Sequence, residues 1–337
     1  MAARADPAAL LAEPSEPRAE LSVPALVGVL AAVGTAIVVA RLAGAGDVPR
    51  IEEFTLVFSS IVVEALPFIL AGALVSSLIA VFVSDRAFTR IGRLPTAVQV
   101  PGAMLCGLAF PVCECGSVPV ARRLISRGVS PAAGIAFMLA APVVNPVVLA
   151  STWVAYSGSG FALEMTAARA AVGFTVAAAA GFALRRVAAV RLSSAPSHSH
   201  DHAGGRLGAV ANHLGSDFLF MGKFLVLGAA VSALIQTFVS RDLLDGLAGI
   251  PILGALALMS LAVLLSLCSE ADAFVAVSFS SFGAGAQLAF LALGPVFDLK
   301  LAALYAATFS RRFVPVLLLV AVPIILVAAT LFEAVVA

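Results

Sequence analysis

The sequence predicts an all-α protein that crosses a membrane several times, a polytopic transmembrane helical bundle made of two repeated modules. Three observations support this prediction: the composition, the length of the apolar runs and the similarity of the two halves. Of the 337 residues, 61% are hydrophobic and 12% are charged, and the mean hydropathy is +1.09. A soluble domain carries about twice this charged fraction. The composition therefore favours a protein whose main partner is the lipid bilayer.

Apolar runs long enough to cross the hydrocarbon core of a bilayer recur along the whole chain. They cover residues 22–41, 54–83, 96–126, 130–156, 161–185, 215–240, 249–282, 286–308 and 313–335. The net charge is +1, which gives no indication of a nucleic-acid partner. The runs therefore predict a multi-pass protein.

Polar stretches divide the chain into four parts. Residues 1–21 are rich in Ala, Pro and Glu and predict a disordered cytoplasmic tail. Residues 22–185 form the first membrane module, which includes an extra N-terminal helix. Residues 186–212 contain Ser, Pro, Gly and His and predict a flexible linker. Residues 213–337 form the second module.

The two modules share similar segments in the same order. Residues 66–84 align without gaps to residues 222–240, and ten of the 19 positions are identical. Cys113 then corresponds to Cys268, and residues 136–145 correspond to residues 289–298. Internal repeats of this kind are common in transporter folds. The similarity predicts a duplicated membrane module.

The run 96–126 favours a broken or re-entrant helix, because it contains three prolines and the polar string CECGS. If this run enters the membrane and returns, the arginine clusters at 84–95 and 122–129 both face the cytoplasm, as positively charged loops prefer. If the corresponding run 249–282 does the same, the second module is inverted relative to the first. The alternative is that both runs are ordinary spanning helices in parallel repeats.

Polar residues at mid-membrane depth are costly, so they indicate where a solute could bind. Cys113, Glu114 and Cys115 place two thiols beside a carboxylate, which predicts a site for a soft metal or metalloid. The alternative is that the cysteines are small, buried and inert.

The second polar cluster contains Cys268, Glu270 and Asp272. Its two acids could carry protons or bind a cation, or they could simply be solvated if the segment reaches the surface. If the repeat brings the two clusters together, the metal ligands are Cys113, Cys115 and Cys268. Three thiolates suit a trivalent metalloid, and a further carboxylate would complete a tetrahedral zinc site.

Asn145 and Asp298 correspond to each other in the repeat, and each lies near the centre of an apolar run beside proline. We expect a helix break with a polar residue at each position. Lys300 lies close to Asp298 in the sequence, so a structural ion pair is the alternative interpretation.

No nucleophile elbow, phosphate-binding loop or dinucleotide fingerprint occurs in the sequence. The sequence therefore predicts that the protein is not an enzyme and has no cofactor.

The string FPVCECGSVPVARRLISRGVSPAAGIAFMLAAPVVNPVVLAS (110–151), with matching strings at 268–279 and 289–301, resembles a family of bacterial predicted permeases. That family is similar to the organoarsenical efflux permeases. The resemblance covers about residues 50–335. It implies a multi-pass permease of the bacterial plasma (inner) membrane, which works with a second permease subunit in some members.

Together these observations predict secondary efflux of a soft metal or metalloid species through a site of thiols and carboxylates. The predicted solute-binding residues are Cys113, Glu114, Cys115, Asn145, Cys268, Glu270, Asp272 and Asp298. One alternative is a membrane subunit that delivers metal to a partner protein. Another is a permease for an anion or a small organic solute.

Overall fold

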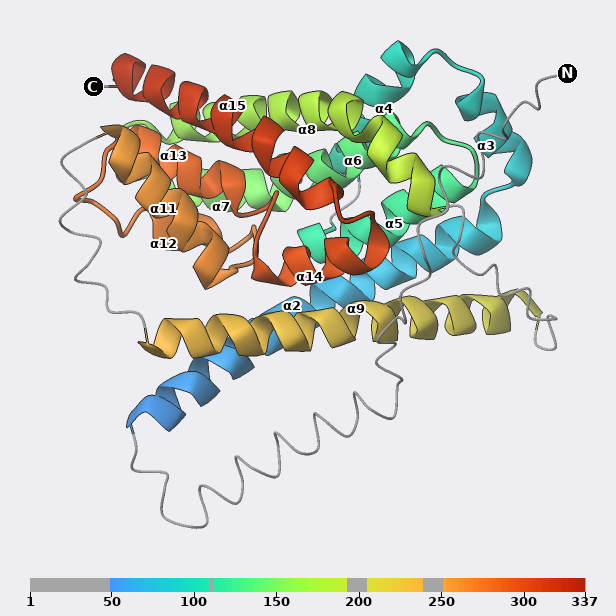
Figure 1. Ribbon diagram of the computed structural model, residues 1–337, viewed down its shortest axis with the longest axis horizontal. Coiled ribbons are helices and arrows are strands. Elements are labelled where there is room, and N and C mark those ends of the chain that lie inside the picture. The colour runs from blue at the N-terminus through green and yellow to red at the C-terminus, as the bar shows by residue number, and fades with distance from the viewer. Residues whose placement is uncertain (1–48, 110–111, 193–204, 239–250, 337) are drawn as a thin grey trace, which may run out of the picture. The chain divides into compact units, whose positions relative to one another are not determined.

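The protein is all-α throughout the part of the chain that its computed structural model describes, which is residues 49–109, 112–192, 205–238 and 251–336 (Figure 1). These residues belong to one compact unit, Asp47–Ala337. The predicted tail 1–21 and the predicted helix 22–41 lie outside the described residues. The all-helical fold class is confirmed.

Seven helices are described in the first half of the chain. They are α2 (Pro49–Phe82), α3 (Asp85–Gly92), α4 (Thr96–Ala109), α5 (Glu114–Ser126), α6 (Pro131–Val144), α7 (Pro146–Tyr156) and α8 (Ala162–Leu192). Six helices are described in the second half. They are α9 (Gly205–Phe238), α11 (Pro251–Leu265), α12 (Asp272–Ala276), α13 (Ala284–Leu293), α14 (Leu299–Thr308) and α15 (Phe313–Val336).

Five described helical segments are long and apolar enough to cross a membrane. They are Ile51–Phe82, Pro131–Tyr156, Ala162–Arg185, Arg206–Thr237 and Phe313–Val336. The segment Pro131–Tyr156 contains α6 and α7, which Asn145 separates. The predicted multi-pass class is therefore confirmed by length and composition. The predicted linker 186–212 is helical at both described ends, because α8 runs to Leu192 and α9 begins at Gly205.

The run 96–126 contains two short helices. α4 has 14 residues and α5 has 13, so each is about 20 Å long, whereas the hydrocarbon core is about 30 Å thick. The run 249–282 is also interrupted, because α11 ends at Leu265 and α12 begins at Asp272. The predicted helix breaks are present in both runs. Re-entrance and inversion remain predictions.

The core of the bundle lies around α6 and α13. Every residue of α6 from Ala132 to Val144 is buried, and so is every residue of α13 from Gly285 to Leu293. Ser130 caps α6 by accepting a hydrogen bond from the Ala133 amide, and Pro131 occupies the first turn, where its missing N–H is harmless. Ala and Gly dominate these helices, so neighbouring helices can approach them closely.

Corresponding helices of the two halves pack in corresponding ways. α6 packs against α4 and α8, and α13 packs against α11 and α15. Across the halves, α12 contacts α7 and α14 contacts α5, while α2 and α9 lie side by side (Figure 1). This order supports the predicted repeat, which stays a prediction.

Two aligned glycines bring α2 and α9 close to their neighbours. A Cβ atom at Gly72 of α2 would lie 2.5 Å from the Cα atom of Gly116 in α5. A Cβ atom at Gly228 of α9 would lie 2.6 Å from the Cα atom of Lys300 in α14. Both contacts are possible only because glycine has no side chain. The long helices therefore pack tightly against the elements that carry Glu114 and Lys300.

Candidate functional site

The first broken segment places a carboxylate at a helix start. Cys113 precedes the first residue of α5, and Glu114 occupies the first turn with 1% of its surface exposed. The positive end of the helix dipole favours a carboxylate at this position. The Ser117 hydroxyl donates to the carbonyl oxygens of Glu114 and Met138, each at 2.9 Å, and so joins α5 to α6.

The second broken segment is irregular between α11 and α12. Ser266 follows α11 with a φ of 49°, in the left-handed region that costs a serine about 1–3 kcal/mol. Its hydroxyl donates to the Val263 carbonyl at 3.0 Å and accepts from the Leu299 amide at 3.2 Å. These bonds tie the segment that carries Cys268 to the start of α14.

The two broken segments meet inside the protein. The Ser269 hydroxyl donates to Oε2 of Glu114 at 3.1 Å. One ligand atom each from Glu114, Cys268 and Glu270 lies within 4.8 Å of the other two. Oε1 of Glu270 is shielded from solvent and accepts no hydrogen bond from the described residues. We call these three residues the mixed-ligand cluster, because they offer one thiol and two carboxylates.

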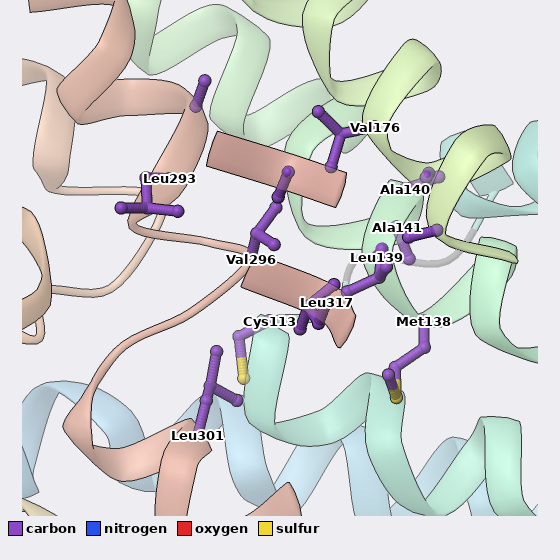
Figure 2. Close-up of a cluster of buried hydrophobic side chains, with 14 of the residues drawn as sticks. Cys113, Met138, Leu139, Ala140, Ala141, Val176, Leu293, Val296, Leu301 and Leu317 are labelled. Atoms are coloured by element: carbon purple, nitrogen blue, oxygen red, sulfur yellow. The ribbon is translucent and has the colours of Figure 1, made fainter. Parts of the chain in front are cut away.

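The other two predicted thiols are buried beside this cluster. Cys113 is 1% exposed and Cys115 is 4% exposed, and the two side chains interact with each other. Figure 2 shows Cys113 in the main apolar cluster, which also contains Val296 and Leu301. Cys268 lies close enough to Cys113 for charges on the two side chains to interact. A ligand set of three thiols remains a prediction, as does the inert alternative.

Asp298 is the N-cap of α14. Its Oδ1 accepts a hydrogen bond from the Leu301 amide at 2.7 Å. The Lys300 ammonium lies 3.4 Å from Oδ2 of Asp298 and 3.4 Å from Oε1 of Glu114. All three side chains are at most 1% exposed. The ion pair between Asp298 and Lys300, expected as an alternative, is therefore present, and Glu114 shares the same ammonium.

Asn145 lies at the predicted break between α6 and α7. Its Oδ1 accepts a hydrogen bond from the Val147 amide at 2.9 Å, which caps α7. Its Nδ2 is fully buried and has no hydrogen-bond partner among the described residues. The break is confirmed, whereas a role for Asn145 in solute binding stays a prediction.

Asp272 pairs with an arginine that the sequence analysis missed. Arg169 of α8 is fully buried, and its Nη2 donates to Oδ2 of Asp272 at 2.7 Å and to the Ser269 carbonyl at 3.1 Å. Its Nη1 donates to the Thr152 hydroxyl at 2.8 Å. The available signal was an arginine inside the apolar run 161–185, since such residues need a buried partner.

Membrane-length helices, helix breaks and buried charges between the breaks are typical of polytopic membrane proteins of the transporter class. The chain belongs to a family described as predicted permease, whose model matches residues 50–334. The family resemblance drawn from the sequence is thereby confirmed. This membership indicates a multi-pass protein of a bacterial membrane, and it suggests a transporter rather than an enzyme.

Two curated relatives are similar over most of their length. The UPF0718 protein YcgR of Bacillus subtilis is 38% identical over 282 residues, which cover 82% of this chain and 96% of the relative. A protein of Streptococcus mutans is 32% identical over 270 residues, which cover 77% of this chain and 87% of the relative. That protein is named as a subunit of a two-component membrane permease complex. No solved structure matches the chain.

Proposed function

We propose that the protein is a secondary efflux permease for a soft metal or metalloid species. The observation that carries this proposal is the mixed-ligand cluster, in which Glu114, Cys268 and Glu270 offer ligand atoms within 4.8 Å of one another. A thiolate selects soft and borderline metals, and carboxylates add the negative charge that a cation needs. The residues come from both halves of the chain.

The surrounding predicted residues receive supporting roles in this proposal. Cys113 and Cys115 lie beside the cluster and would add thiol ligands for a solute that prefers sulfur. Asp272 is held by Arg169 and would keep the second broken segment in place. Asn145 and Asp298 would line the path at their helix breaks. Relative movement of the two halves would expose the cluster to each side of the membrane in turn.

The test compares metal and arsenical accumulation in cells that carry the wild type or a variant with both Cys113→Ser and Cys115→Ser. We expect the variant cells to accumulate more of the transported species, because a hydroxyl is a poor ligand for a soft ion. Cys106→Ser is the matched control, because Cys106 is exposed on α4. Equal accumulation of every soft metal and arsenical in all three strains would contradict a role for Cys113 and Cys115, and the same result for Cys268→Ser would contradict the mixed-ligand cluster.

A second candidate function is a membrane subunit that delivers metal to a partner. The name of the Streptococcus mutans relative favours it, because that name describes one subunit of a two-component complex. Liposomes that contain only this chain distinguish the two candidates. Solute flux supports a self-sufficient permease, whereas binding without flux supports a subunit that needs a partner. Flux that is insensitive to thiol substitution would favour an anion or a small organic solute.

A further inference from the structure

One ammonium lies between two buried carboxylates next to the mixed-ligand cluster. Lys300 is 3.4 Å from oxygens of both Glu114 and Asp298. Its ammonium donates a hydrogen bond to Oε1 of Glu114. Oδ2 of Asp298 is buried, lies at the same distance from this ammonium, and has no other donor in the described part of the chain. Asp298 therefore has spare capacity to take the ammonium completely.

Both carboxylate oxygens of Glu114 are already engaged. Oε1 accepts from Lys300 and Oε2 accepts from Ser269. Each oxygen keeps a second lone pair, so a cation that binds to Glu114 shares the carboxylate with these donors unless charge repulsion moves one of them away. The ammonium is the donor to displace, because two cations on one buried carboxylate repel each other strongly. Asp298 is close enough to receive it.

The charges near the cluster indicate the class of solute. Arg169 and Asp272 form a neutral pair at 2.7 Å. When ionised, Glu114, Glu270 and Asp298 carry three negative charges, and Lys300 supplies one positive charge. Glu64 of α2 is half-buried and is a further electrostatic neighbour of Glu114 and Lys300. A cation with two positive charges would balance the three carboxylates and the ammonium, and a thiolate at Cys268 or an ionised Glu64 would leave the occupied site negative.

We infer that the mixed-ligand cluster binds a divalent soft or borderline cation, and that Lys300 competes with this cation for Glu114. When the cation binds, the ammonium moves to Asp298. Lys300 thus sets the affinity and the charge of the solute without being a ligand itself. The inference rests on the proposed function and narrows its solute from soft species in general to divalent cations such as Cd²⁺ or Zn²⁺.

The experiment measures Cd²⁺ binding to the full-length protein in lipid nanodiscs by equilibrium dialysis. Lys300→Met keeps a stem of similar length, and we expect it to bind Cd²⁺ about tenfold more tightly because the competing charge is gone. Lys300→Arg keeps the charge, and we expect binding close to that of the wild type. Lys223→Met is the matched control, because the Lys223 ammonium lies over the rings of Phe220 and Phe224.

A second variant should change affinity in the opposite direction. In Asp298→Asn the ammonium has Glu114 as its remaining carboxylate partner, so we expect Cd²⁺ binding to weaken about tenfold. Asn still caps α14, because asparagine is as good an N-cap as aspartate. In the Lys300→Met background, Asp298→Asn should weaken Cd²⁺ binding less than it does in the wild type, because it then removes only the charge of Asp298 and no longer its hold on the ammonium.

The outcomes separate this inference from the proposed function. If Glu114→Gln abolishes Cd²⁺ binding while Lys300→Met binds no more tightly than the wild type, the competition is refuted and the soft-metal site stands. If neither the wild type nor Lys300→Met binds Cd²⁺ but both bind a trivalent arsenical, the divalent class is refuted. If neither solute binds, the proposed function fails as well. Should Lys300→Met not fold, an Asp298→Asn affinity equal to that of the wild type refutes the competition.

Discussion

The two broken segments meet at one cluster, yet they are built differently. The first is compact: Glu114 begins a regular helix, and Gly116 in the same turn touches the backbone of α2. The second is irregular, with a left-handed Ser266 and with Asp272 paired to Arg169 of α8. The comparison shows that a regular helix start and an irregular loop can form one site, because the first segment supplies a carboxylate and the second supplies a carboxylate and the thiol.

Removing the cation that holds the second segment should have the largest effect. Arg169→Met leaves Asp272 as an uncompensated buried charge, which costs about 3–5 kcal/mol of stability. Urea unfolding of the protein in micelles measures this loss. Arg123→Met is the matched control, because its ion pair with Asp217 is partly exposed, at 17% and 19%, and should contribute about 1 kcal/mol or less.

Adding Asp272→Asn to Arg169→Met should restore part of the stability, because the buried negative charge is removed with its partner. A double variant no more stable than Arg169→Met would show that the arginine acts through packing or through its bonds to Thr152 and Ser269. The second segment would then depend on the arginine itself rather than on the charge pair.

The thiols of the two segments should differ in their effect on metal affinity. Both thiols are buried in the apolar core, but Cys268 belongs to the mixed-ligand cluster and Cys113 does not. We expect Cys268→Ser to weaken Cd²⁺ binding by at least about 10- to 100-fold, the range found when a residue that only orients a metal ligand is lost. Cys113→Ser should have a smaller effect, and Cys106→Ser none. A larger effect for Cys113→Ser would reverse the roles of the two segments.

The direct bond between the segments should have the smallest effect. Ser269→Ala removes the hydrogen bond to Glu114 and should cost about 1–2 kcal/mol, because a buried carboxylate loses a donor. Ser278→Ala is the control, because this exposed hydroxyl bonds within its own turn. Thermal unfolding of both variants provides the measurement. Equal stability of the two variants would mean that Lys300 alone connects Glu114 to the second half.

Local signals in the sequence predicted the helix breaks and their polar residues. Proline and a capping side chain act within a few residues, so the breaks at Asn145 and Asp298 could be read directly. The mean hydropathy of the run 96–126 could not distinguish one long helix from two short ones, because it is the same for either arrangement. The interrupted runs were therefore recognised from prolines and polar residues alone.

The partners of the buried charges could not be predicted. Glu114 and Lys300 are 186 residues apart in the chain, and Arg169 and Asp272 are 103 residues apart. Such pairs depend on how helices pack in three dimensions, and a single sequence contains no direct signal for that packing. A charged residue in an apolar run indicates that a buried partner exists, but only the fold shows which residue that partner is.

The contact of Gly72 with Gly116 has a mechanical consequence. It joins two backbones directly, so no side-chain rotamer can absorb a displacement of one helix relative to the other. Gly116 is two residues from Glu114, which the second half holds through Ser269 and Lys300. We therefore expect a movement of that carboxylate to displace α2. Binding of the solute should then change the contacts between this long helix and the surrounding lipid.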